Sequence, residues 1–330
     1  MDGLTFLIIK RLFYGLLTLL ALSVIIFFMV ELLPGDTATS LLAMGKTEET
    51  LAAMREQMGL DRPAVVRYFE WLGGVVQGDF GNSMVRGVHT SKGVSDMANV
   101  SVISIISERF MNTLFLATYA AVIAVPVAII LGVLIALLRN SVYDRIANVL
   151  TLTSISSPEF FLAYILILYL ALKTGLFPAI STIKDDMTFF ESLERTFLPA
   201  LTLVLVCIAH MMRMTRAAII NLLASPYIEM AQMKGIPPWK VIVRHALPNA
   251  WAPIINVVAL NLAYLITGVV LVEIVFVYPG IGQILVDAVT LRDFPVVQAC
   301  CLIFASTFIL LNLIADVVAI VTNPRLRHPK

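Results

Sequence analysis

The chain has 330 residues, of which 59% are hydrophobic and 14% are charged, and its formal net charge is +1. Soluble domains carry about 25% charged residues, so this composition excludes an ordinary water-soluble globular protein. The near-neutral charge gives no support for a nucleic-acid-binding surface.

The first long apolar run covers residues 12–33 and follows Lys10 and Arg11. A cleaved signal peptide has an apolar core of about 7–15 residues and a small-residue cleavage site. This run is longer and continues into Pro34 and Gly35. We therefore expect residues 1–33 to form a retained N-terminal transmembrane helix.

The next segment, residues 34–109, is polar and mixed in charge. We expect it to form a long external loop with short helices. Thr47 can cap a helix over residues 47–58, and residues 64–77 have the pattern of a second, amphipathic helix. Residues 79–83 have the composition of a turn. The aromatic residues of the second helix are interpreted as packing residues: Tyr68, Phe69 and Trp71.

The remainder of the chain contains five more apolar stretches, each long enough to cross a hydrocarbon core of about 30 Å. They are continuously apolar and not alternating, which favours helices over barrel strands. The predicted fold is an all-α integral membrane protein with about six transmembrane helices, five of them in a domain over residues 110–322 that precedes a tail at 323–330. Pro126 and Pro158 are expected to kink their helices. The five stretches are 111–138, 147–172, 197–220, 254–278 and 297–321.

Orientation follows from the distribution of Lys and Arg over the short loops. With the N-terminus inside, twelve basic residues lie on the cytoplasmic side, namely Lys10, Arg11, Arg139, Arg145, Arg213, Arg216, Lys234, Lys240, Arg244, Arg325, Arg327 and Lys330. The short external loops hold four, namely Lys173, Lys184, Arg195 and Arg292. Both termini are therefore predicted to be cytoplasmic.

No catalytic or nucleotide-binding constellation is recognisable. Gly45, Lys46 and Thr47 resemble the end of a phosphate-binding loop, but that loop needs a glycine at the position of Ser40. No His-Glu-x-x-His or Gly-x-Ser-x-Gly motif is present, and the cysteines lie in apolar segments as packing residues would. We expect no metal, cofactor or catalytic residue in this chain.

The cytoplasmic loop between the fourth and fifth predicted spans has the pattern of two short helices. Ser225 followed by Pro226 favours a helix start, and Glu229 suits the first turn. Gly235 favours a helix end, and Pro237 precedes a second helix near Trp239. From these residues alone, a solvated loop with an interfacial helix and a docking surface are equally good interpretations, since Trp239 would also suit a headgroup layer.

The same loop resembles the EAA loop of ABC importer permeases. Its sequence Glu229-Met-Ala-Gln-Met-Lys-Gly235, followed by His245-Ala-Leu-Pro248, fits the family pattern, with Met230 where an alanine is usual. Further segments resemble the dipeptide/oligopeptide permease subfamily in family order over nearly the whole chain. They are Leu33-Pro-Gly-Asp36, Gly59-Leu-Asp61, Gly78-Asp-Phe-Gly81 with Ser83, Arg213-Met-Thr-Arg216, Glu273 with Phe276 and Pro279-Gly-Ile-Gly282, Arg292-Asp293 with Pro295-Val-Val-Gln298, and Asn323-Pro-Arg325.

The resemblance implies a permease subunit of a type I importer in the bacterial inner membrane. It implies four kinds of partner: a second homologous permease, two cytoplasmic ATPase subunits that bind ATP and Mg, a periplasmic substrate-binding protein and the lipid bilayer. It places a coupling helix in the loop, with a small Ala231 pressed close to the ATPase. The implied coupling residues are Tyr227, Glu229, Ala231, Lys234, Gly235, Trp239, His245 and Pro248.

Three acidic residues lie within the predicted spans and are functional candidates for that reason. We predict that Glu159 and Glu273 lie on the translocation path or at its gate. For each acid, and for Asp316, an interhelical pair or an end position that reaches water is the simpler interpretation.

Two other function classes compete with an ABC permease. A secondary transporter or channel would work without ATP, but no matching halves with broken helices are visible. A membrane-embedded enzyme lacks a catalytic set. The subfamily handles dipeptides and oligopeptides, glutathione, nickel complexes, sugars and opine-like compounds, and nothing in the chain selects among them.

Overall fold

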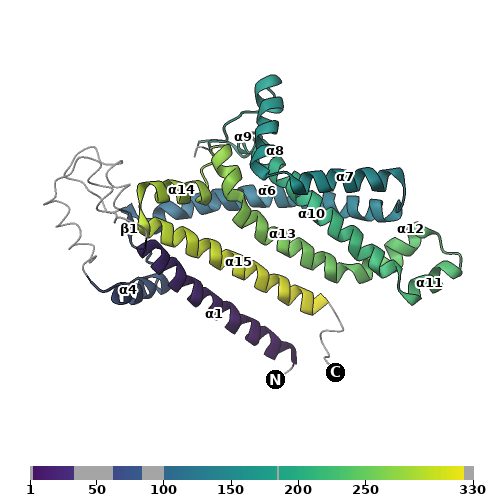
Figure 1. Cartoon of the computed structure of the whole chain (residues 1–330), viewed down its shortest axis with the longest axis horizontal. Helices are drawn as coiled ribbons and strands as arrows, with labels where there is room; N and C mark the ends of the chain where they lie inside the picture. Colours follow the sequence, from purple (N-terminus) through teal and green to yellow (C-terminus); the bar gives the residue numbers. More distant parts are fainter. Residues whose placement is uncertain (1–2, 33–61, 84–99, 184–185, 323–330) are drawn as a thin grey trace. The chain divides into compact units, whose positions relative to one another are not determined.

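A computed structural model describes residues 3–32, 62–83, 100–183 and 186–322 (Figure 1). The long helices are α1 (Gly3–Glu31), α6 (Val102–Leu137), α10 (Phe197–Leu223), α13 (Leu247–Val275) and α15 (Phe294–Thr322). The shorter helices are α4 (Ala64–Val76), α7 (Val142–Ser156), α8 (Glu159–Leu166), α9 (Phe189–Arg195), α11 (Pro226–Met233), α12 (Pro238–Val241) and α14 (Ile281–Leu291). Two π-helical segments, η1 (Ile167–Lys173) and η2 (Ile242–Ala246), and two short strands, β1 (Asn82–Ser83) and β2 (Val100–Ser101), complete the described elements.

The described helices confirm an all-α membrane protein. Four of them, α1, α6, α10 and α15, are each long and apolar enough to cross a bilayer alone. Two bent pairs, Val142–Ser156 with Glu159–Lys173 and Pro238–Trp251 with Pro253–Ile266, raise the number of spans to six if each pair is one span. The α6 helix begins at Val102, nine residues before the predicted span. At 1.5 Å per residue its 36 residues exceed the hydrocarbon thickness, so polar residues extend it beyond the lipid.

The predicted third span is broken into two helical segments. Between α7 and α8 the chain turns by 104° at Ser157 and Pro158. Proline forces the preceding residue into an extended conformation, and Ser157 has ψ 132°. The kink expected at Pro158 is therefore confirmed, and it is much sharper than a bend within one helix. Pro126, in contrast, lies inside the continuous helix α6.

Compact unit 1 comprises residues 1–13, 114–278 and 307–330. Its core is built from α6, α8, α10 and α13. The α6 helix presents alanines at positions 117, 120, 124 and 128, spaced three and four residues apart on one buried face. Small residues let membrane helices approach closely, and the same buried cluster includes Leu203 and Met211 of α10 and Val272 of α13.

One glycine marks a close approach of α6 to α10. A Cβ atom at Gly132 would lie 2.8 Å from Cβ of Thr215 and 3.0 Å from the carbonyl oxygen of Met212. Real Cβ contacts are longer, so no larger residue fits without moving a helix. Gly132 therefore fixes the distance between α6 and α10 at Thr215, the residue before Arg216.

Helix α9 begins with a capping box. The backbone N–H of Thr188 donates to Oε2 of Glu191 at 2.8 Å, and the Glu191 N–H donates to the Thr188 hydroxyl at 3.4 Å. These hydrogen bonds stabilise the carboxylate, so the pKa of Glu191 lies below its usual range.

Compact unit 2 comprises residues 14–113 and 279–306. Within it, Tyr68 of α4 is buried and its hydroxyl lies 2.9 Å from Oγ of Ser23 on α1. The Phe27 ring is 5.5 Å from Tyr68 and 5.7 Å from Trp71, centroid to centroid. The packing role predicted for Tyr68 and Trp71 is confirmed, whereas Phe69 is 64% exposed. The helix predicted over residues 47–58 lies outside the described residues.

Unit 2 also joins segments that are distant in sequence. After the predicted turn, in which the N–H of Gly81 donates to Oδ1 of Asp79, β1 pairs antiparallel with β2. The Ser83 hydroxyl donates to Asp293, a buried residue. The motif-like segments around Gly81 and Arg292 therefore meet within this unit, although neither strand was expected from the sequence. The domain boundaries at residues 33, 109 and 322 stay predictions.

Candidate coupling site

The loop between α10 and α13 folds as two short helices joined by a glycine turn (Figure 1). Ser225 is extended, with ψ 144°, and Pro226 opens α11, as expected for a residue that needs no hydrogen bond in the first turn. Lys234 ends the helix, and Gly235 turns the chain with φ +75°. Pro237 then precedes α12, and η2 leads into α13. The helix–turn–helix prediction for this loop is confirmed.

The loop has a small apolar core of its own. Ile228 and Ala231 of α11 are buried against Val241 and Ala246, and Leu223 and Ile236 pack around them. The Ala231 side chain is only 8% exposed, and its carbonyl oxygen accepts from the Ile236 N–H at 3.4 Å. The family resemblance implied that Ala231 presses on a partner. In the structure it faces inward, because its small size lets α11 lie close to α12 and η2.

The opposite face of α11 is exposed and carries large side chains. We call Tyr227, Met230, Met233 and Lys234 the α11 outer stripe, since three- and four-residue steps keep them on one side of the helix. Met233 is 81% exposed and Met230 59%. Exposed apolar side chains of this size are typical of interaction surfaces, and methionine adapts its shape to a partner. In the sequence, Met230 was notable only as a departure from the usual alanine, and no pattern pointed to Met233.

The remaining predicted coupling residues lie around this stripe in different ways. The Asn249 side chain donates to the Tyr227 hydroxyl at 3.1 Å and to the His245 carbonyl at 3.0 Å, which ties α11 to the base of α13. His245 is half-buried in η2, and Pro248 is exposed in the first turn of α13. Glu229 is exposed next to the stripe, and Trp239 is 60% exposed on α12.

Gly235 occupies a left-handed conformation in open space. Its N–H donates to the Gln232 carbonyl at 2.9 Å, and a Cβ atom there would have no neighbour within 4 Å. A larger residue would therefore meet no clash. Its left-handed backbone conformation would still cost about 1–2 kcal/mol of strain energy. The turn needs glycine for its backbone and not for its size.

The candidate gate residues both lie in unit 1. Glu159 opens α8 directly after the 104° bend, and its Oε2 atom is buried without a hydrogen-bond partner among the described residues. Glu273 is fully buried in α13, and its carbonyl oxygen accepts from the Tyr278 N–H at 2.8 Å. For Asp316, the interhelical interpretation is confirmed, because its carboxylate lies 2.7 Å from the guanidinium of Arg11.

Comparison with known proteins decides the family. Residues 128–328 match the family described as binding-protein-dependent transport system inner membrane component. Residues 4–117 match the N-terminal family of the same membrane components. The chain belongs to this permease family. It is a transmembrane subunit of an ABC importer, and the permease subunits of this family are not the catalytic ones.

Individual relatives agree with this assignment. The permease is 35% identical over 321 residues to the "Glutathione transport system permease protein GsiC" of Salmonella choleraesuis (strain SC-B67) and of Escherichia coli (strain K12). These matches cover 97% of this chain and 98% of each relative. A chain of the inward-facing MetNI methionine ABC transporter shares the fold with a TM-score of 0.51 and 16% identity, covering 67% of the permease and 97% of that chain.

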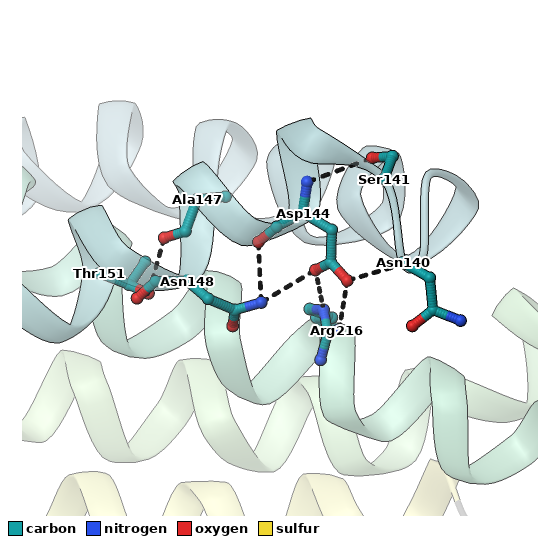
Figure 2. A network of polar contacts seen from close by, with 7 residues as sticks. All are labelled: Asn140, Ser141, Asp144, Ala147, Asn148, Thr151 and Arg216. Carbon is teal, nitrogen blue, oxygen red and sulfur yellow. Dashed lines mark hydrogen bonds and ion pairs between the residues drawn. The ribbon is translucent and has the colours of Figure 1, made fainter.

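A buried polar network in the permease was not anticipated from the sequence. Figure 2 shows the Arg216 guanidinium of α10 and the Asp144 carboxylate of α7 facing each other, with Nε–Oδ1 and Nη2–Oδ2 both at 2.8 Å. The Asn140 N–H donates to Oδ2 at 3.0 Å, and the Asn148 amide donates to Oδ1 at 3.0 Å. The Asp144 side chain is 6% exposed and that of Arg216 23%. The resemblance had marked Arg216 within Arg213-Met-Thr-Arg216, but nothing in the sequence names its partner.

Proposed function

We propose that α11 is the coupling helix through which an ATPase subunit drives this permease. The observation that carries the proposal is the α11 outer stripe, which projects from a closed apolar core. A helix held from behind in this way can be pushed as a rigid body without unfolding the loop. ATP binding would draw two ATPase subunits together and switch the transmembrane helices between inward- and outward-facing arrangements.

The residues of the loop have different roles in this proposal. Met230 and Met233 supply apolar contact at the centre of the proposed interface, and Glu229 and Lys234 supply polar contacts around it. Ala231 supports the helix from behind, and Gly235 sets its angle to α12. ATP and Mg are bound by the ATPase subunits in this proposal, and a second, homologous permease completes the pathway.

The cargo proposed for the importer is glutathione or a short peptide. The support is the printed function of the 35% identical GsiC permeases together with the peptide-permease resemblance. A periplasmic binding protein would deliver the cargo, and the external segment 34–109 is proposed to receive it. The proposed location is the bacterial inner membrane, with both termini in the cytoplasm.

A purification in mild detergent tests the coupling assignment. A tagged permease should bring down ATPase subunits, and Met233→Glu should reduce the recovered ATPase at least tenfold, because a charge enters the apolar centre of the interface. Leu176→Glu is the matched control, since Leu176 is also exposed but lies outside both the loop and the predicted spans. A homogeneous homodimer that transports alone would overturn the proposal.

The gate assignment has its own test. Glu273 is buried in α13, and in this proposal its charge belongs to the pathway gate. Glu273→Gln keeps the shape of the side chain and removes the charge, so it should change both glutathione uptake and the ATP hydrolysis coupled to it. If both rates equal those of the wild type, Glu273 is a packing residue.

A further inference from the structure

The Asp144–Arg216 pair joins two helices at a site that the coupling loop does not include. Arg216 lies two turns before the end of α10, and Asp144 lies in the first turn of α7. Two parallel hydrogen bonds of 2.8 Å fix both the distance and the angle between the guanidinium and the carboxylate (Figure 2). The Asp144 N–H also donates to the cap residue Ser141 at 3.2 Å. The pair therefore holds the beginning of α7 in a defined orientation on α10.

A second contact reinforces this attachment. Gly132 of α6 touches Thr215, the neighbour of Arg216, so closely that no side chain fits between the helices. The chain passes from α6 to α7 in a short turn, at which Asn140 has φ +65° and donates its N–H to Asp144. The C-terminal half of α10 is thus attached to the α6–α7 corner at two adjacent points, one a van der Waals contact and one an ion pair.

The two helices lead in opposite directions from this attachment. Following α10 forward, the chain reaches α11 after Leu223. Following α7 forward, it reaches the 104° bend and then α8, which carries Glu159 and packs against α10 and α13. α7 also packs directly on α10, and the ion pair is the charged contact between them near the end that leads to α11.

We infer that Asp144 and Arg216 are positioning residues that make α7 follow α10 when the ATPase moves the coupling helix. The inference rests on the proposed coupling function of α11. Arginine is required because its planar fork transmits rotation as well as displacement, whereas a lysine is a point charge that swivels. Breaking the fork should leave α10 free to move while α7 lags behind.

Distance measurements between two spin labels test this motion in the assembled importer. The labels are placed on Val149 of α7, which is 62% exposed, and on Asn221 of α10, also exposed, after Cys207, Cys300 and Cys301 are changed to alanine. The distance is measured without nucleotide and after trapping with ATP and vanadate. In the otherwise wild-type permease the distance should stay constant, because α7 and α10 move together.

Variants of the pair should separate the two helices. With Arg216→Lys and with Asp144→Asn, trapping should shift the distance or broaden its distribution about twofold, as expected when a fixed contact becomes mobile. Arg213→Gln is the matched control, since Arg213 is exposed on the same helix one turn earlier, and it should behave as the wild type. A wild-type distance that changes on trapping, or an Arg216→Lys distribution as narrow as the wild type, overturns the inference.

Two further measurements separate this inference from a folding role and from the proposed function. If the pair serves only folding, Arg216→Lys should lower the amount of inserted protein and its melting temperature without altering the trapped distance distribution. If no ATPase copurifies with the permease, the proposed function fails before any distance is measured. An ATPase that copurifies, together with a wild-type-like distance in every variant, refutes the positioning role alone.

Discussion

The coupling loop and the Asp144–Arg216 network are both connected to α10 but differ in which side chains they bury. The loop keeps small apolar residues inside and shows its large side chains to the outside, as Ala231 and Met233 illustrate. The network buries its charged groups, and these groups are paired with each other instead of with a partner protein. In the proposed function the loop contacts a partner protein, whereas the network holds two helices in a fixed geometry. Substitutions should therefore cost more stability in the network, where they also uncouple α7 from α10, and should mainly reduce transport in the loop.

The largest effect on stability is expected where one charge of the buried pair is removed. Arg216→Met leaves the Asp144 carboxylate desolvated without its partner, and such losses cost about 3–5 kcal/mol. The measurement is thermal unfolding of the purified permease in detergent. The exposed pair Arg62–Glu70, with side chains 60% and 55% exposed, supplies the control, and Arg62→Met should cost under about 1 kcal/mol. Equal losses of unfolding free energy for Arg216→Met and Arg62→Met would show that burial does not make the Asp144–Arg216 pair more important for stability.

An intermediate effect on stability, with complete loss of function, is expected at the glycine turn. Gly235→Ala introduces about 1–2 kcal/mol of left-handed strain, and relief of that strain would tilt α11 away from its partner. Uptake should be abolished while the protein stays in the membrane, as measured by transport in cells and by the amount of inserted permease. Gly235→Pro should act in the same direction.

The control for this prediction is another left-handed glycine. Gly175 has φ +66° and, like Gly235, open space at its Cβ position. Gly175→Ala therefore carries the same strain outside the coupling loop and should retain uptake. Normal uptake by a stably inserted Gly235→Ala permease would contradict the docking assignment.

The smallest effect is expected at the Arg11–Asp316 pair. Its side chains are 54% and 34% exposed, and both residues lie near the ends of their predicted spans, where long charged side chains can reach the headgroup layer. Arg11→Gln should change the free energy of unfolding by less than about 1 kcal/mol, measured as a small shift of the melting temperature. A loss as large as that of Arg216→Met would mean that exposure does not rank the ion pairs of this protein.

The same contrast explains how much of the structure was predictable. The loop depends on local signals: Pro226 at a helix start, Gly235 at a helix end, and a hydrophobic pattern between them. Each of these acts within a few residues, so the sequence indicates the outcome directly. The spans are similarly local, since about 20 apolar residues suffice to indicate a transmembrane helix.

Features that depend on distant partners were not predictable in the same way. Asp144 and Arg216 are 72 residues apart, and Ser83 and Asp293 are 210 residues apart. A charge in a sequence gives no sign of which distant group will face it once the helices pack. The inward position of Ala231 was missed for a related reason, because it depends on how α12 and η2 fold back. At Pro158 the sequence indicated a kink but not its size, since the angle of 104° also depends on where α8 packs, and α8 packs on α10 and α13.

The closed core beneath α11 has a consequence for the evolution of such transporters. Ile228, Ala231, Val241 and Ala246 hold the helix in place without help from its outer stripe. Natural selection can therefore exchange Met230 or Met233 for other side chains without unfolding the loop. Under the proposed function, a duplicated permease could bind a different ATPase after a few surface substitutions and keep its cargo route. The choice of ATPase would then be separable from the helices that the ATPase moves.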